Sequence, residues 1–213
     1  MVLYSFFNSS TSYRARIALA LKGLSYETRT VNLRAGEQHS EAYRAHSPMG
    51  GVPVLIDDAG RAITQSLAIL EYLDAIAPEP RLFPLDPVAR AQVQELVLLV
   101  ACDVHPLNNL RVLKFLTGEL AVSAEDKQRW YAHWIAQGFG AMEVLLGRVS
   151  RHPYCFGDAP GAADCCLVPQ VANALRMGCD MSAYARVMSV YRHCMQLEPF
   201  KSAAPECQPD YRA

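Results

Sequence analysis

The feature that most constrains the fold of this chain is a change in hydrophobic pattern near residue 80. Before that point, short β-forming runs alternate with segments whose apolar residues recur at helical spacing. The elements predicted there are, in chain order, a strand at 2–6, a helix at 11–22, a strand near 27–31, a weak helix from about 38 to 46, a strand at 52–56, a short segment at 61–63 and a helix at 66–77. A β-α-β unit followed by β-β-α has the size of a small α/β domain.

Only helices are predicted after this α/β unit. The stretches Ala77–Pro80 and Phe83–Pro87 form a proline-rich connector, which cannot continue a helix. The later segments with apolar residues at three- and four-residue spacing are 88–117, 124–147, 163–176 and 183–195. The sequence therefore predicts an α/β unit joined to an all-helical unit.

Hydroxyl side chains gather where the first predicted strand passes into the first predicted helix. Ser9, Ser10, Thr11 and Ser12 stand at this helix entrance, where backbone N–H groups are unpaired and the helix dipole favours negative charge. Hydroxyl donors there can hydrogen-bond a sulfur anion and lower the pKa of the thiol. The same residues also suit plain N-caps, so the pattern alone leaves both interpretations open.

Two further positions have both a structural and a ligand-binding interpretation. Pro53 either marks the start of a strand or, as in a thioredoxin-like domain, follows a cis peptide bond that turns the backbone of Val52 toward an extended ligand. Ser66 is either an ordinary N-cap or, with Gln65, a grip for a ligand carboxylate at the positive end of the helix.

Charge and cysteine content exclude several classes of function. The formal net charge of -1 gives no electrostatic reason to expect nucleic acid or an anionic membrane as a partner. The longest apolar run, Leu96–Cys102, is too short to span a bilayer, and we expect a soluble protein without a secretion signal. The seven cysteines are odd in number and lack metal-site spacing, so we expect reduced thiols, a cytoplasmic location and no bound metal.

Four segments, taken in order, resemble zeta-class glutathione transferases. They are Ser9–Leu19, Val52–Pro53, Gln65–Ile69 and Ala163–Val171, and the resemblance extends over essentially the whole chain. The activities known within that class are the glutathione-dependent cis-trans isomerisation of maleylacetoacetate and, in a bacterial branch, of maleylpyruvate. The resemblance therefore implies an isomerase of aromatic-compound or tyrosine catabolism.

The resemblance also implies a fold, a cofactor and a set of site residues. The glutathione transferase fold places a thioredoxin-like, glutathione-binding α/β domain at residues 1–80 and an all-α, substrate-binding domain at residues 87–213, in a homodimer. Ser9, Ser10 and Thr11 match the segment that contacts the glutathione sulfur. The other residues implied to contact glutathione are Gln38, Val52, Pro53, Gln65, Ser66, His105 and Asn109. Asp164 matches a buried acid with a capping role.

The chain departs from the family pattern at several of these places. Thr11 stands where the family has a cysteine, which argues against any mechanism that needs a protein thiol. Asn8 replaces a usual arginine, so one carboxylate contact is expected to be missing. Tyr13 stands where the family tends to have Trp or His. Gly161 replaces a threonine cap, so half of a capping box is given up, with a modest expected loss of stability.

Two arginines bear on the substrate. Arg111 and Arg176 match arginines that the maleylpyruvate branch uses to hold substrate carboxylates, for which a guanidinium is well suited. An arginine on a long helix is otherwise a solvated surface residue, and that alternative stays open for both. The implied mechanism is nucleophilic catalysis by the cofactor, in which reversible addition of the thiolate to the cis double bond permits rotation.

Two other functions stay open from the sequence. One is a different glutathione chemistry, such as conjugation or reductive dehalogenation, and Thr11 disfavours dehalogenation because a protein thiol would be wanted there. The other is a non-enzymatic binding module on the same scaffold. The joint presence of Val52–Pro53, Gln65–Ser66 and the hydroxyl cluster counts against the binding module.

Overall fold

The computed structural model describes residues 1–149 and 152–212, which divide into two compact units. The first unit comprises Met1–Phe83 and the C-terminal segment from Met195, and the second comprises Pro84–Cys194. The sequence places residues 195–213 with the helices of the second unit, whereas their contacts join them to the first. No described helix is both long enough and apolar enough to cross a membrane.

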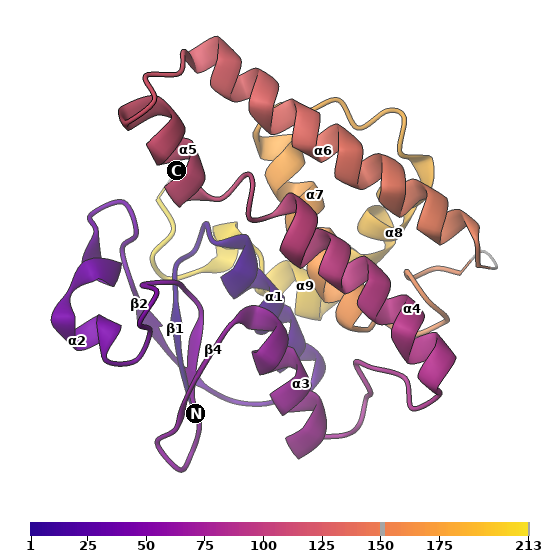
Figure 1. Ribbon diagram of the computed structural model, residues 1–213. Helices are drawn as coiled ribbons and strands as arrows, with labels where there is room; N and C mark the ends of the chain where they lie inside the picture. The colour runs from indigo at the N-terminus through magenta and orange to yellow at the C-terminus, as the bar shows by residue number, and fades with distance from the viewer. Residues whose placement is uncertain (150–151, 213) are drawn as a thin grey trace. The chain divides into compact units, whose positions relative to one another are not determined.

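A four-stranded mixed sheet forms the centre of the first unit (Figure 1). The strand order is β2-β1-β3-β4, with β1 and β2 parallel and the other pairs antiparallel. Leu3 lies opposite Thr28 on one side and Leu55 on the other, so β1 is a central strand. The strands are β1 (Val2–Ser5), β2 (Glu27–Thr30), β3 (Val54–Ile56) and β4 (Ala62–Thr64). This arrangement confirms the predicted β-α-β and β-β-α order.

Helices cover both faces of this sheet. Helices α1 (Ser10–Leu21) and α3 (Ser66–Ile76) pack together, and their apolar residues form a core with the central strands. Residues of this core with no exposed surface include Leu3, Ile17, Leu55, Ile69 and Leu73. On the other face, Tyr43 of the short helix α2 (Glu41–Arg44) packs against Val31 and Val54.

The segment predicted as one weak helix from 38 to 46 is two short helices. The 3-10 helix η1 (Glu37–His39) ends at Ser40, which then serves as the N-cap of α2 by accepting a hydrogen bond from the Tyr43 N–H at 3.3 Å. Ser40 has extended backbone angles, so a continuous helix is interrupted there.

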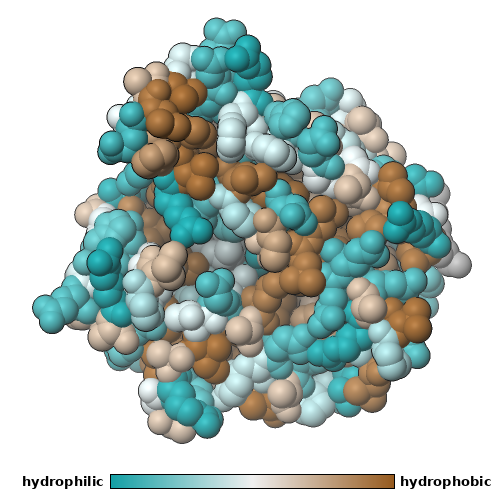
Figure 2. Space-filling view, in the orientation of Figure 1, coloured by the Kyte–Doolittle hydropathy of each residue, from teal (hydrophilic) through white to brown (hydrophobic). Residues whose placement is uncertain are grey.

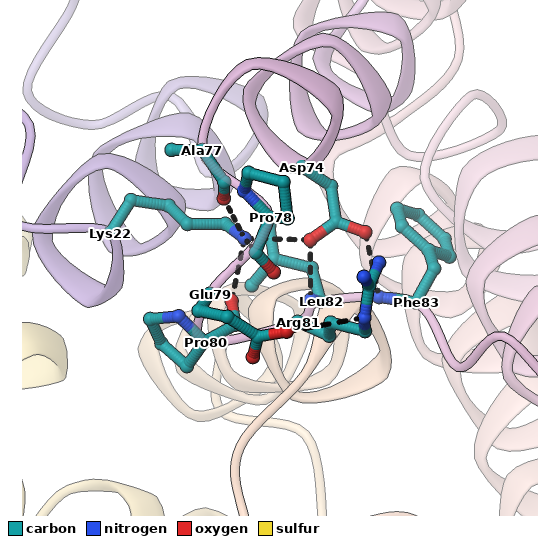
Figure 3. Close-up of polar contacts among 9 residues, drawn as sticks. All are labelled: Lys22, Asp74, Ala77, Pro78, Glu79, Pro80, Arg81, Leu82 and Phe83. Carbon is teal, nitrogen blue, oxygen red and sulfur yellow. Dashed lines mark hydrogen bonds and ion pairs between the residues drawn. The ribbon is translucent and has the colours of Figure 1, made fainter.

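A buried lysine ties the end of α1 to the connector that follows α3. The Lys22 ammonium lies among oxygen atoms in Figure 3, and it donates to Asp74 Oδ1 at 2.6 Å, to Ala77 O at 2.7 Å and to Pro80 O at 2.5 Å. The Asp74 carboxylate also accepts the Leu82 N–H at 2.7 Å. The Lys22–Asp74 pair thus supplies hydrogen-bond partners for several backbone groups of the proline-rich connector, which is not helical and cannot pair them within itself.

Helices make up the second unit among its described residues, as predicted. They are α4 (Pro87–Leu98), the π-helical segment η2 (Leu99–Val104), α5 (Leu110–Gly118), α6 (Ala124–Gly147), α7 (Ala162–Arg176) and α8 (Ala185–Cys194). The single helix predicted at 88–117 is wrong, because a turn at 105–109 separates η2 from α5. Pro106 lacks the N–H that a continuing helix would need, and Asn109 starts α5 as its N-cap.

A glycine of α6 allows close packing between helices, and an aspartate fixes the start of α7. Gly138 of α6 packs so closely on η2 that an added Cβ would lie 2.1 Å from Val104 Cγ2. At the start of α7, Asp164 Oδ2 accepts the N–H of the cap residue Gly161 at 2.9 Å, while Oδ1 accepts the Cys155 N–H at 2.9 Å. Asp164 is buried, which raises the pKa of its carboxyl group. Gly161 has no side chain, so only half of a capping box forms.

All seven cysteines are free thiols, and their exposure differs sharply. Cys102 and Cys207 are exposed, whereas Cys155 and Cys194 lie buried beside Asp164. Burial raises the pKa of both buried thiols, and the nearby carboxylate acts in the same direction. The buried cysteines therefore act as small apolar core residues.

Hydrophobic atoms gather on the surface over α5, at the upper left of Figure 2. The exposed apolar residues of this helix include Leu110 and Phe115, and Phe115 is 55% exposed.

The structure also contains a short helix that the sequence did not predict, α9 (Glu198–Ser202), followed by the 3-10 helix η3 (Pro205–Cys207). Tyr13 Oη donates to Phe200 O at 2.8 Å, a hydrogen bond that joins α9 to α1 within the first unit.

Candidate functional site

The predicted hydroxyl cluster forms a connected chain at the start of α1. Ser9 is the N-cap, and its Oγ accepts the Ser12 N–H at 3.2 Å. The Ser9 and Thr11 hydroxyls lie 2.9 Å apart, and Thr11 Oγ1 donates to Val52 O at 2.8 Å. Ser9 and Thr11 are half-buried, whereas Ser10 and Ser12 are buried.

The donors in this chain can be assigned because each hydroxyl carries one hydrogen. Thr11 donates its hydrogen to Val52 O, so the hydrogen between Ser9 and Thr11 comes from Ser9. The Ser9 hydroxyl can rotate toward an anion without breaking the bond between Thr11 and Val52. Ser9 is therefore the hydroxyl that can be redirected to a sulfur anion at the lower cost.

The peptide bond between Val52 and Pro53 is cis, as the thioredoxin-like interpretation expects. The preceding residue, Gly51, is held firmly: Ser47 Oγ accepts the Gly51 N–H at 3.0 Å and donates to Gly51 O at 2.9 Å. Tyr43 Oη also donates to Gly51 O, at 2.7 Å. Burial raises the pKa of Tyr43, which keeps this phenol protonated as a donor.

The entrance of α3 has an unusual backbone. Gln65, the N-cap residue, has φ of 67° and makes no side-chain cap, so the first N–H groups of α3 remain open to a ligand. A non-glycine residue at positive φ costs on the order of 1–3 kcal/mol, and such residues concentrate at ligand sites. Ser66 is buried, and its Oγ accepts from Arg14 Nη1 at 3.3 Å, which leaves its own hydrogen for donation.

A cavity of about 250 Å³ joins these features within the first unit. It is lined by Thr11, Ser47, Pro48, Met49, Gly51, Val52, Pro53, Thr64, Gln65 and Ser66. The structure thus brings together five of the residues expected to contact glutathione, and Ser9 reaches them through its bond to Thr11. The sequence interpretation missed the loop that begins at Ser47, although this loop leads directly into the cis proline.

Gln38 lies next to the cavity-lining loop. A Cβ added to Gly50 would lie 2.9 Å from Gln38 O, so the loop can approach this residue only with glycine at position 50, which also has φ of 64°. Gln38 is 8% exposed, and its Oε1 has no hydrogen-bond partner among the described residues. A buried acceptor of this kind suits an N–H donor from a ligand.

The remaining predicted residues lie in the second unit. His105 and Asn109 were expected on a long helix but lie in the turn that divides it, where Asn109 Nδ2 is 3.1 Å from His105 Nε2. Asn109 Oδ1 also accepts the Arg111 N–H at 3.1 Å. Arg111 and Arg176 are both exposed, and Arg176 Nη2 donates to Asn173 Oδ1 at 2.8 Å.

Comparison with known proteins identifies the family of this chain. Residues 1–75 match the glutathione S-transferase N-terminal domain. A probable maleylacetoacetate isomerase of Vibrio cholerae is 46% identical over 99% of the chain and 98% of its own length. A solved maleylpyruvate isomerase described as a bacterial glutathione S-transferase of the zeta class is 41% identical, with a TM-score of 0.96 and full coverage of both chains. The chain belongs to the zeta class of glutathione transferases. Both the predicted resemblance and the predicted fold class are confirmed.

Two further solved structures share the fold over the full length. A maleylpyruvate isomerase from Pseudomonas aeruginosa PAO1 is 55% identical, with a TM-score of 0.87 and full coverage of both chains. A maleylacetoacetate isomerase from Methylobacterium extorquens AM1, crystallised with malonate and GSH, is 35% identical, with a TM-score of 0.96 and full coverage of both chains.

Proposed function

We propose that the chain catalyses the glutathione-dependent cis-trans isomerisation of a maleyl keto-acid, either maleylpyruvate or maleylacetoacetate. The observation that carries this proposal is the cavity that joins Thr11, the Val52 backbone before cis-Pro53, and Gln65 with Ser66 at the open end of α3. Homologues over the full length bear the names of these two isomerases.

The residues of the cavity fit glutathione. The open N-terminus of α3, with the Ser66 hydroxyl, suits the γ-glutamyl carboxylate. The Val52 backbone before the cis proline suits pairing with the peptide groups, and the unpartnered Gln38 Oε1 suits a further ligand N–H. The hydroxyls of Ser9 and Thr11 and the start of α1 suit the sulfur. A full-length relative crystallised with GSH supports glutathione as the ligand.

The chemistry that glutathione supplies when bound is reversible addition of its thiolate to the cis double bond, which permits rotation. The protein contributes a lowered thiol pKa, because Ser9 can donate to the sulfur anion and the dipole of α1 favours its charge. Through its two hydrogen bonds, Thr11 holds the Ser9 hydroxyl and the Val52 carbonyl at fixed positions relative to each other. Ser10 follows Ser9 in the first turn and completes the proposed catalytic set with Thr11.

Substrate binding is proposed for the second unit. Arg111 and Arg176 would hold the substrate carboxylates, since a guanidinium binds a carboxylate through two parallel hydrogen bonds. The Arg111 side chain is exposed, so it is accessible to a ligand carboxylate. His105 and Asn109 stay proposed glutathione contacts on the ground of the family resemblance alone. The malonate in the relative's structure is a dicarboxylate, which supports recognition of this chemistry in the family.

We also propose a cytoplasmic homodimer, in which residues 1–80 bind glutathione and residues 87–213 bind the substrate. The free state of all seven thiols supports a reducing compartment. Sedimentation equilibrium measures the mass in solution, and a purely monomeric chain at micromolar concentration would contradict the dimer.

The proposed function is tested by assaying maleylpyruvate and maleylacetoacetate side by side with Ser9→Ala, Ser10→Ala and Thr11→Ala. We expect turnover to depend on glutathione, and Ser9→Ala to shift the pH dependence of kcat most. Arg111→Ser should raise the KM for maleylpyruvate more than the KM for maleylacetoacetate. Turnover that survives all three hydroxyl changes with an unchanged pH profile would place the thiolate elsewhere.

A further inference from the structure

Both backbone polar groups of Phe7 are bound by charged side chains. Its N–H donates to Asp210 Oδ2 at 3.0 Å, across 203 positions of sequence. Its carbonyl accepts from Arg16 Nη2 at 3.1 Å. Phe7 is buried and stands two residues before Ser9, in the segment that carries the chain from β1 to the hydroxyl cluster.

Arg16 connects this segment to the C-terminal part of the chain. Arg16 is 1% exposed, and its guanidinium donates to Ser5 Oγ at 2.9 Å and to Ala203 O at 2.8 Å. Burial lowers the pKa of Arg16 to about 10, and the nearby Asp210 carboxylate is among the groups that oppose this shift. Arg16 therefore stays charged at neutral pH, and Asp210 supplies part of its counter-charge.

Ring contacts hold the C-terminal tail at the same place. The Tyr211 ring meets the Phe7 ring edge-on, with centroids 5.6 Å apart, and the Arg34 guanidinium lies 5.3 Å from the Phe7 ring centroid. Gln208 fixes the preceding turn of the tail by donating to Ala204 O at 2.9 Å. Figure 1 shows the yellow C-terminal segment running beside the indigo start of the chain.

The same segment determines where Ser9 lies. The Ser9 N–H donates to Phe6 O at 3.0 Å, and this carbonyl also accepts from Arg16 Nη1 at 3.4 Å. Any shift of the Phe6–Phe7 backbone therefore moves the residue whose hydroxyl is proposed to bind the sulfur. A misplacement of about 1 Å in a group that takes part in the chemistry can cost about a hundredfold in rate.

We infer that Asp210, together with Arg16, is a positioning residue for the thiolate site, so that the C-terminal tail sets the direction of the Ser9 hydroxyl. This inference rests on the proposed role of Ser9 in binding the glutathione sulfur. It assigns a part in the chemistry to a segment that lies at the opposite end of the sequence from the hydroxyl cluster.

The test compares Asp210→Ala, Asp210→Asn and a control on the same tail, Glu206→Gln. Glu206 is exposed and accepts no hydrogen bond from the described residues, although its charge also acts on Arg16. The readouts are the ultraviolet titration of the bound glutathione thiol, the kcat and KM for the keto-acid, and the thermal unfolding temperature. Ser9→Ala is included as a reference for loss of the proposed thiolate donor.

Asp210→Ala should raise the apparent pKa of the bound thiol by about one unit, so that the thiolate fraction and kcat near neutral pH fall about tenfold. The KM for the keto-acid should stay within about twofold, and activity should recover at higher pH, which a purely structural role would not produce. Asp210→Asn keeps an acceptor for the Phe7 N–H and should restore most of the titration. Glu206→Gln should match the wild type.

The outcomes distinguish the positioning role of Asp210 from the proposed thiolate site at Ser9. A wild-type thiol titration in Asp210→Ala, alongside a shifted titration in Ser9→Ala, overturns the positioning role and leaves the proposed function intact. An unchanged titration in both variants overturns the proposed thiolate site, and the positioning role with it. A lowered unfolding temperature with an unchanged titration shows that Asp210 only stabilises the fold.

Discussion

The Thr11 hydroxyl donates to the Val52 carbonyl at 2.8 Å, so the start of α1 and the residue before the cis proline are joined by one hydrogen bond. Thr11→Val removes this bond and leaves the Val52 carbonyl without its hydroxyl donor, while the shape of the side chain at position 11 is kept. We expect the KM for glutathione to rise about three- to tenfold, consistent with a loss of about 0.5–1.5 kcal/mol. Steady-state kinetics with varied glutathione measures this.

Thr11→Ser is the matched control, because it keeps the hydroxyl and should stay close to the wild-type KM. Equal KM values for the valine and serine variants would show that the bond to Val52 plays no part in binding.

The loop before the cis proline gives a second prediction. Ser47→Ala removes both hydrogen bonds to Gly51, one in each direction. We expect a weaker affinity for glutathione and a free energy of unfolding lower by about 1–3 kcal/mol. Ser40→Ala, which removes the α2 cap, should cost about 1 kcal/mol without changing the affinity. Calorimetric titration with glutathione distinguishes the two, and equal affinities would contradict the role given to Ser47.

Close packing of α6 on η2 gives a third prediction. Gly138→Ala places a methyl group in the volume of the Val104 side chain, and overpacking of this kind lowers the free energy of unfolding by about 1–3 kcal/mol. Gly140→Ala lies on the same helix with nothing near its Cβ, so it should raise stability by about 0.5–1 kcal/mol. Urea unfolding measures both, and effects of the same sign would refute the packing argument.

The buried charge of Lys22 gives a fourth prediction. Lys22→Met leaves the Asp74 carboxylate and several connector carbonyls without a donor, which should lower the free energy of unfolding by about 3–5 kcal/mol. Lys201→Met, at an exposed lysine, should change stability by less than about 0.5 kcal/mol. Guanidinium unfolding of the pair tests this. A small effect of Lys22→Met would mean that the connector is held by its other contacts.

Asp57 gives a prediction about pH. Its carboxylate accepts the Arg61 N–H, the Arg61 side chain and the Ala59 N–H, and these bonds hold the pKa of Asp57 below its ordinary value. Because the folded pKa is lowered, the stabilisation is present above the ordinary pKa of 3.8 and is lost as pH falls through the folded value.

Asp57→Asn should therefore flatten the loss of stability on acidification below about pH 4. Urea midpoints measured at stepped pH test this. Asp58→Asn removes a neighbouring exposed charge and should leave the acid dependence close to that of the wild type. An unchanged acid dependence in Asp57→Asn would contradict the prediction.

Local signals made most of the fold predictable. The start of α1 at Ser9 and the start of α3 at Gln65–Ser66 carry capping or hydroxyl residues, and the alternation of β-forming runs gave the strands. The break before α5 was missed because apolar spacing continues across it and outweighed Pro106 in the prediction. Helix α9 was missed because five residues are too few to show a period.

The site shows the limit of local patterns more clearly. Thr11, Val52 and Ser66 could be proposed from motif positions, but Ser47 could not, because its importance comes from two hydrogen bonds to Gly51 that leave no mark in the sequence. The contact between Phe7 and Asp210 is similarly invisible, since it joins the two ends of the chain only after folding.

The buried cysteines can report local unfolding of the helical unit. In the folded chain, Cys102 and Cys207 present their sulfur atoms to solvent, whereas Cys155, Cys165, Cys166 and Cys194 are enclosed. A thiol-reactive probe would label the exposed pair at once and reach the enclosed set only when the helices around Asp164 separate. The rate of that slow labelling would time local unfolding of the helical unit without any engineered label.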